Sequence, residues 1–162
     1  MKRSLVLWQL GGLTFTAVLG TLLHFLYPLT GFLPSAAIAA VNESTWEHMK
    51  ILFFPMLFFA IFQSFFFQAD YENFWWIQLF GILLGLLLIP VLFYTYNGAF
   101  GKSPAWFNVA TFFLAAGVAY LFEGWLLYRD DPRILSPVLP ILLVSLLALA
   151  FILFTFFSPK LP

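Results

Sequence analysis

Five long apolar runs fill most of this 162-residue chain, and each is long enough to cross a lipid bilayer. They cover residues 5–27, 49–67, 74–94, 105–128 and 138–157. A hydrocarbon core of about 30 Å needs roughly 20 helical residues. Because the runs are continuous and do not alternate with polar residues, helices are favoured over a barrel. The sequence therefore predicts an all-α membrane protein, a bundle of five transmembrane helices.

The composition leaves no room for a separate soluble domain. Hydrophobic residues make up 63% of the chain and charged residues 9%, whereas about a quarter of a soluble domain is charged. We therefore expect residues 1–162 to form a single integral membrane domain surrounded by the lipid bilayer. Basic and acidic residues balance at seven each, so no basic surface is available for nucleic acid. The absence of cysteine excludes disulfides, thiolate metal sites and cysteine nucleophiles.

The connection between the first two runs is apolar but too short to cross a membrane. It includes residues 28–41, and Pro34 within it suits the first turn of a helix. We expect a short re-entrant or interfacial half-helix there. A connection of this length in a compact bundle more often carries function than merely joins two helices.

The basic residues predict an orientation by a small margin. With the N-terminus inside, four of them lie on the inner side and three on the outer side. The inner ones are Lys2, Arg3, Arg129 and Arg133, and the outer ones are Lys50, Lys102 and Lys160. The positive-inside rule then places the N-terminus inside and the C-terminus outside.

The densest polar cluster of the chain, residues 42–50, lies at the start of the second run. Charge at a membrane boundary is costly unless it is paired or hydrated, so the cluster is a candidate functional site. Part of it also fits a capping box, with Ser44 as the helix N-cap and Glu47 reaching back to it. Lys50 would then extend along the helix to water. This structural interpretation leaves Asn42, Glu43 and His48 unexplained.

The functional interpretation starts the second helix one turn earlier. Glu43 and Glu47 are then four residues apart and share a face. His24 approaches from the first run, along a stripe of small residues suited to close helix packing, namely Gly12, Thr16 and Gly20. Carboxylates and imidazoles are ligands for zinc, iron or manganese. A candidate set for such a divalent metal is His24, Glu43, Glu47 and His48. A hydrogen-bonded or proton-handling network of the same side chains is the favoured alternative.

Other polar and small residues extend these predictions. Tyr96 follows the end of the third run, at the same membrane face as the cluster. The candidate ligand-binding set is therefore His24, Asn42, Glu43, Glu47, His48 and Tyr96. Gly81 and Gly85 form a GxxxG motif, which packs helices within a bundle or between protomers of a homo-oligomer. Glu123 is an acid inside the fourth run. We expect its head group in water at the inner face, with a proton or ion relay as the alternative.

A resemblance to a known family covers nearly the whole chain. Residues 41–55 resemble the signature of domain of unknown function 6512, a family of small bacterial multi-pass membrane proteins. Residues 24–27, 89–96 and 154–159 look like the same family's pattern. The resemblance implies a five-span protein with no assigned activity, and we expect it in a bacterial cytoplasmic membrane.

Three functional hypotheses remain open from the sequence. The leading one is binding or translocation of a cation, proton or small polar solute at the outer-face cluster. The second is a metal-dependent, membrane-embedded hydrolase or transferase acting on a lipid, with Glu43 or Glu47 as general base. The third is an accessory membrane subunit with no site of its own, in which the cluster only caps a helix.

Overall fold

The computed structural model describes residues 2–68, 70–129 and 136–157, and side chains from Ser4 onward. Within these residues it contains α-helices and one 3-10 helix, and no strand. The elements are α1 (Lys2–Thr30), η1 (Leu33–Ala37), α2 (Thr45–Phe67), α3 (Phe74–Phe100), α4 (Ala105–Tyr128) and α5 (Val138–Phe157). Positions 133 and 160, used above for orientation, and positions 158–159 of the family pattern lie outside the described residues.

All five α-helices are long and apolar enough to cross a membrane, which confirms the expected all-α bundle. The helix α2 begins at Thr45, four residues before the predicted start, and two helices continue beyond their predicted C-terminal ends. The helix α1 continues to Thr30 and α3 to Phe100, and each stops at a glycine with a positive φ, Gly31 at +59° and Gly101 at +84°. Glycine adopts this left-handed conformation without steric cost. The polar residues after position 94 therefore prolong α3 and do not end it.

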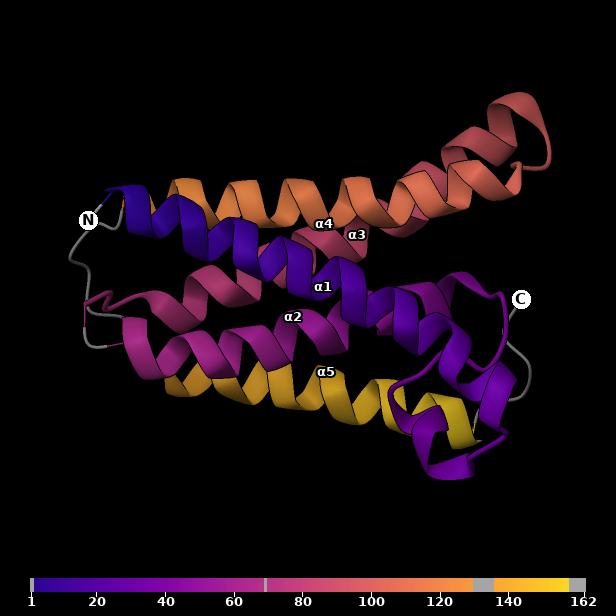
Figure 1. Cartoon of the computed structure of the whole chain (residues 1–162), viewed down its shortest axis with the longest axis horizontal. Helices are drawn as coiled ribbons and strands as arrows, with labels where there is room; N and C mark the ends of the chain where they lie inside the picture. The colour runs from indigo at the N-terminus through magenta and orange to yellow at the C-terminus, as the bar shows by residue number, and fades with distance from the viewer. Residues whose placement is uncertain (1, 69, 130–135, 158–162) are drawn as a thin grey trace.

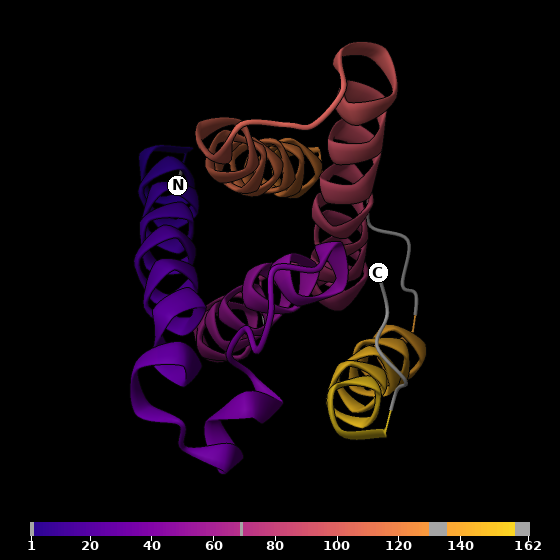
Figure 2. The same ribbon diagram turned by 90° about the vertical axis from the view of Figure 1, so that its right-hand side faces the viewer.

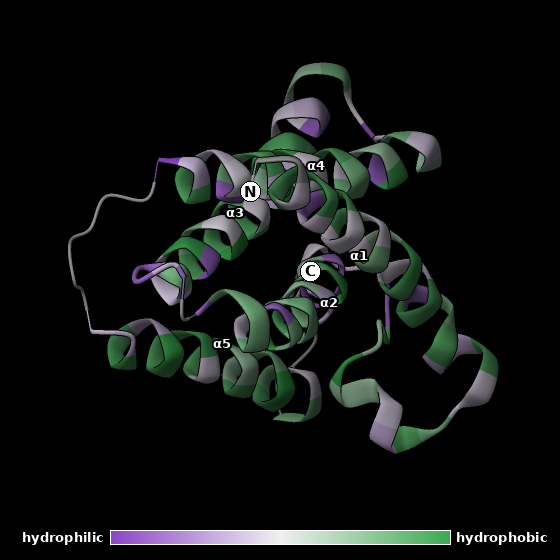
Figure 3. Cartoon of the chain, turned by 60° about the vertical axis from the view of Figure 1, so that its left-hand side comes forward, coloured by the Kyte–Doolittle hydropathy of each residue, from purple (hydrophilic) through white to green (hydrophobic). Residues whose placement is uncertain are grey.

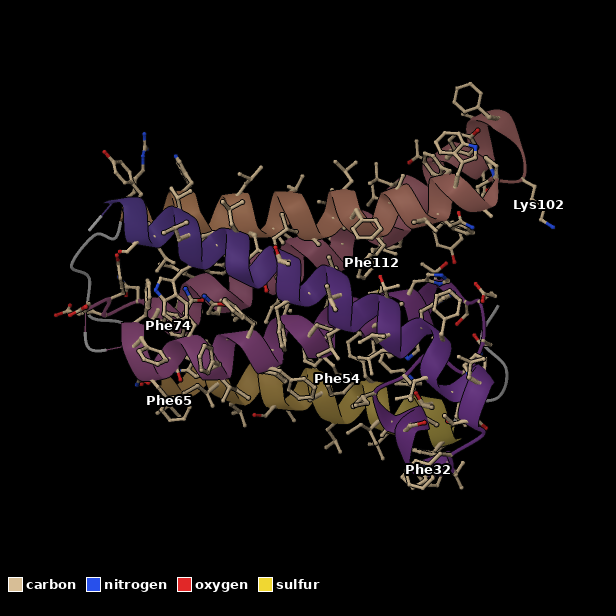
Figure 4. The ribbon with its side chains drawn as sticks, viewed as in Figure 1. Phe32, Phe54, Phe65, Phe74, Lys102 and Phe112 are labelled. Atoms are coloured by element: carbon tan, nitrogen blue, oxygen red, sulfur yellow. The ribbon has the colours of Figure 1, made fainter. Side chains whose placement is uncertain are left out.

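The central helix of the bundle is α2, which packs against all four other α-helices (Figures 1 and 2). The helix α5 lies at the edge and contacts α2, α3 and η1. Hydrophobic residues predominate along the helices (Figure 3), and many large ones are exposed. Leu29, Phe65 and Phe157 are each 80% exposed, and Phe65 projects from the lower edge of the bundle in Figure 4. A surface this apolar fits contact with lipid.

Small residues bring the helices into close contact within one protomer. Gly12 and Gly20 of α1 lie against aromatic rings of α2 and α4, and Thr16 between them hydrogen-bonds the Tyr120 hydroxyl at 2.8 Å. Gly81 and Gly85 are buried against α4. They therefore do not offer a surface to a second protomer, which was one of the two roles expected for them.

The connection between α1 and α2 is compact. The expected half-helix is a five-residue 3-10 turn, η1, which packs against α1 and α5. After η1 the chain folds back onto α1, where the Ala40 amide donates to the Leu23 carbonyl at 3.2 Å. Ala39 and Ala40 are buried in the core. The chain is therefore fixed close to α1 just before it reaches the polar cluster.

Candidate functional site

The start of α2 is set by Ser44. Its hydroxyl accepts from the Glu47 amide at 3.4 Å, and the Asn42 side chain accepts from the Ser44 amide at 2.9 Å. The helix therefore begins at Thr45 with Ser44 as N-cap. The earlier start, with Glu43 and Glu47 on one helical face, is wrong because this cap ends the extended segment at Ser44. Glu43 stands before the helix and is free to turn towards α1.

Three side chains converge at this end of the bundle from α1, the connection and α2. The Nε2 atoms of His24 and His48 each lie 3.7 Å from an oxygen of the Glu43 carboxylate. The two imidazole rings are 5.5 Å apart between centroids. One potential ligand atom from each residue can be chosen so that all three atoms lie within 4.8 Å of one another. We call His24, Glu43 and His48 the triad.

A backbone hydrogen bond orients His48. Its Nδ1 lies 2.9 Å from the Ser44 carbonyl oxygen, which can only accept, so Nδ1 carries the proton. The Nε2 atom is then unprotonated in the neutral ring, and it is the atom that faces Glu43. Metal-binding histidines are commonly held in this way, with one ring nitrogen donating to a carbonyl and the other bound to the metal. The capping turn of α2 therefore fixes the orientation of the His48 ring, with Nε2 towards Glu43.

The triad is slightly more open than a closed zinc site. Bonds of about 2.0–2.1 Å in tetrahedral geometry separate ligand atoms by about 3.3 Å, compared with separations of up to 4.8 Å here. Glu43 can close this difference because its side chain is 81% exposed, whereas those of His24 and His48 are only 25% and 18% exposed. Two neutral imidazoles and one carboxylate leave a fourth position open on a tetrahedral ion.

Glu47 is held apart from the triad. Its carboxylate lies 2.7 Å from Lys50 Nζ and accepts from the Val41 amide at 3.0 Å. Lys50 also donates to the Ala36 carbonyl at 2.8 Å and to the Thr155 hydroxyl at 2.9 Å. The expectation that Lys50 reaches water is wrong, because these three acceptors satisfy its ammonium group at 0% exposure. The pair ties α2 to η1 and α5, and so fixes the connection that carries Glu43.

Two cavities adjoin the triad. A groove of about 340 Å³ is lined by the triad and by residues of α1, α2 and α4, including Gly20, Phe112 and Phe113. Phe112 lies between α4 and α1 in Figure 4. A chamber of about 20 Å³, bounded by Glu43, His48, Asn108 and Thr111 among others, is large enough for one water. Thr111 Oγ1 is buried there with no hydrogen-bond partner among the described residues.

The other predicted ligands lie elsewhere. Tyr96 stacks on Phe107 at 4.0 Å between ring centroids and lines neither cavity. Asn42 is exposed, and its side chain forms the turn before Ser44. Sequence reasoning missed the buried pair of Glu47 and Lys50. Their i, i+3 spacing at the start of an apolar helix was the available signal.

Comparison with known proteins places the chain in a family. The family of unknown function DUF6512 matches residues 2–162. The chain belongs to this family. The match confirms the resemblance first found in residues 41–55, and it includes the whole triad. No curated protein matches the chain, and no solved structure matches it. The function of this DUF6512 member therefore has to be argued from its geometry.

Proposed function

We propose that this integral membrane protein binds a divalent transition metal, foremost zinc, through His24, Glu43 and His48. The observation that carries the proposal is the hydrogen bond of His48 Nδ1 to the Ser44 carbonyl, which leaves Nε2 available beside Glu43. A carboxylate alone between two imidazoles could be an ordinary hydrogen-bonded group. A ring fixed in the metal-binding tautomer, with a third ligand from another helix, favours a metal.

The surrounding charges are compatible with a divalent cation. Lys50 is neutralised by Glu47 at 2.7 Å and is separated from solvent. Lys102 lies on the turn between α3 and α4, which projects from the bundle (Figure 4). The triad lies at one end of the helices and not halfway along them. The proposal is therefore for capture of an ion at a membrane face, and the predicted orientation makes this the outer face.

Titration of metal-free, detergent-purified protein with zinc tests the proposal. We expect one zinc per chain, and an affinity reduced by about 10-fold or more in His24→Ala, Glu43→Gln and His48→Ala, since each removes a ligand. Glu72→Gln is the matched control, because Glu72 is also an exposed acid but precedes α3. No zinc binding, or equal binding in all variants, would refute the proposal. The accessory-subunit hypothesis would then account best for the cluster.

A second candidate function is supported by the groove beside the triad. Three protein ligands with one open position are typical of catalytic zinc sites, and the groove of about 340 Å³ lies between apolar side chains of α1 and α4. A metal held there would polarise a bound water next to a lipid chain. This favours the hydrolase hypothesis for a lipid ester or amide. With Glu43 as a ligand and Glu47 paired to Lys50, neither acid is free to act as the general base that the sequence predicted.

Lipid analysis separates the two functions. Zinc-loaded wild-type protein and the His24→Ala/His48→Ala variant are incubated with vesicles of mixed phospholipids and sphingolipids, and the products are identified by mass spectrometry. Zinc-dependent cleavage by the wild type alone would establish the hydrolase. Zinc binding without any cleaved lipid would assign the protein to metal binding.

A further inference from the structure

The end of the bundle opposite the triad contains a buried acid. Glu123 of α4 is 0% exposed, and neither of its carboxyl oxygens has a hydrogen-bond partner among the described residues. The expectation that its head group lies in water is wrong, because the side chain points into the bundle towards Gly81 of α3. An acid in this position is costly to keep charged and calls for an explanation.

The helix facing Glu123 is shaped to receive it. A Cβ atom on Gly81 would overlap the carboxyl group of Glu123. Any other residue at position 81 would therefore push the acid out of its place. A Cβ atom on Gly85, one turn further along, would lie 3.1 Å from Leu52 and 3.3 Å from Ala119, so the helices are closely packed there. The GxxxG motif of α3 thus does two things, because Gly85 packs helices and Gly81 makes space for a carboxyl group.

Three glutamines on the other helices lie at a similar depth. Gln9 of α1, Gln63 of α2 and Gln78 of α3 are each buried. Each of these glutamines, like Glu123, lies four to seven residues from the nearer end of its own helix, or about 6–10 Å along the helix axis. The Gln78 amide donates to Gln63 at 3.4 Å, one turn from Gly81. Gln9 lies over Gly124, and both of its amide atoms lack partners among the described residues.

No described charge balances the acid. The phenol of Tyr120 lies one turn away on α4, and its hydroxyl bonds to Thr16. Arg129 lies over the Trp125 ring, 4.8 Å from its centroid, where α4 ends. An unpaired carboxylate in an apolar interior is strongly unfavourable, and uptake of one proton removes the charge.

A groove connects this region to the end of the bundle. It has a volume of about 370 Å³ and runs between α1 and α4, from Leu5 and Tyr128 near the helix ends past Gln9 and Gly124 to Leu13 and Gly117. Gln9 therefore lines the groove and also lies against Gly124, the residue that follows Glu123 in α4. A proton entering from this membrane face needs to cross only the first turns of the helices.

We propose that Glu123 is a proton-binding site within the bundle, and that it exchanges its proton with water at the end where α1 begins. The site is separate from the triad, which lies at the opposite helix ends, and it does not depend on metal binding there. Gly81 provides the space for the acid, and Gln9 is the buried polar side chain that lines the groove beside Gly124.

Labelling with a hydrophobic carbodiimide tests the proposal, because this reagent modifies protonated carboxyl groups in apolar surroundings. The full-length protein in lipid vesicles is labelled over a series of pH values and mapped by mass spectrometry. We expect an adduct on Glu123 whose formation falls about tenfold per pH unit once the acid titrates. Glu123→Gln should remove the adduct, and His24→Ala/His48→Ala should leave it unchanged, which keeps the result independent of the metal site.

Several outcomes would overturn the proposal. These are no adduct on Glu123 at any pH, an adduct that does not depend on pH, or protection by sodium at constant pH and ionic strength. Sodium protection would assign the site to a metal ion. Glu123→Gln has the shape of the neutral acid and should fold normally. If it does not, Gly81→Ala provides the second test, since the displaced acid should lose its labelling while the protein remains folded.

Discussion

At the scale of single residues, the buried pair of Glu47 and Lys50 determines how the triad is presented. The pair satisfies its own charges, anchors η1 through the Ala36 carbonyl and reaches α5 through Thr155. A buried ion pair adds little net stability relative to an apolar pair, but removing one partner leaves an uncompensated charge. Its main effect here is to fix the position of the connection in front of α2.

This pair gives a prediction about stability. Lys50→Met and Glu47→Gln should each lower the free energy of unfolding by about 3–5 kcal/mol, because the remaining group is buried without its partner. The double variant should be less destabilised than the sum of the two. Chemical unfolding in detergent measures all three. Additive losses would show that the two side chains do not interact as described.

A second prediction at this scale concerns Tyr96. The sequence placed it among the ligands, whereas the structure stacks it on Phe107. Tyr96→Phe keeps the ring and removes only the hydroxyl. We expect unchanged zinc affinity in a titration beside Glu43→Gln. A loss comparable to that of Glu43→Gln would mean that α3 moves towards the triad when the metal binds.

Individual residues also show where sequence reasoning ended. The capping pattern correctly predicted Ser44 as the N-cap of α2. It could not show that Glu47 turns to Lys50 while Glu43 turns to the histidines, because the fold sets these contacts and the spacing along the chain does not. That choice depends on η1 and on Thr155, which lies 105 residues from Lys50 along the chain.

At the scale of helices, glycine positions separate packed faces from lipid-facing ones. Gly11 and Gly12 are neighbours in α1, but a Cβ on Gly11 would meet nothing within 4 Å, whereas one on Gly12 would overlap the rings of Phe59 and Tyr120. The four-residue stripe in the sequence already indicated that Gly12 and Gly20 share a face. It did not indicate which helices they touch.

The matched pair Gly11→Ala and Gly12→Ala tests this packing. Gly12→Ala should destabilise the protein by about 1–3 kcal/mol through overpacking. Gly11→Ala should be neutral or stabilising by up to about 1 kcal/mol, since alanine favours the helix. Thermal unfolding in detergent compares them directly. Equal effects of both substitutions would contradict the helix arrangement around α1.

Features that depend on the local sequence could be predicted, whereas features that depend on contacts between helices could not. The apolar runs predicted all five helices because span length and hydropathy are local properties. The sequence predicts the end of α3 at residue 94 because polar residues follow it, whereas the helix continues to Phe100. The burial of Glu123 was missed because its cause is the missing side chain of Gly81 on a different helix.

At the scale of the whole molecule, the five helices place successive connections on alternate membrane faces. Glu72 precedes α3 and Lys102 follows it, so the two should lie on opposite sides. Single cysteines at these positions, in a chain without native cysteine, can be labelled with a membrane-impermeant maleimide. We expect Lys102→Cys to react from outside and Glu72→Cys only after permeabilisation. Equal labelling would contradict the span count, and reversed labelling would contradict the orientation.

The two ends of the bundle have different chemistry in this account. One end holds the triad beside a groove between α1 and α4, and the other holds Glu123 beside a second groove between the same two helices. We propose that a metal binds at the first of these ends, in the triad.

X-ray absorption spectroscopy of the zinc-loaded protein tests this claim most directly. We predict a first shell of nitrogen and oxygen at about 2.0–2.2 Å with the outer-shell scattering of two imidazoles. One imidazole should be lost in His24→Ala and one in His48→Ala. A shell without imidazole scattering, or one that neither substitution changes, would contradict the account.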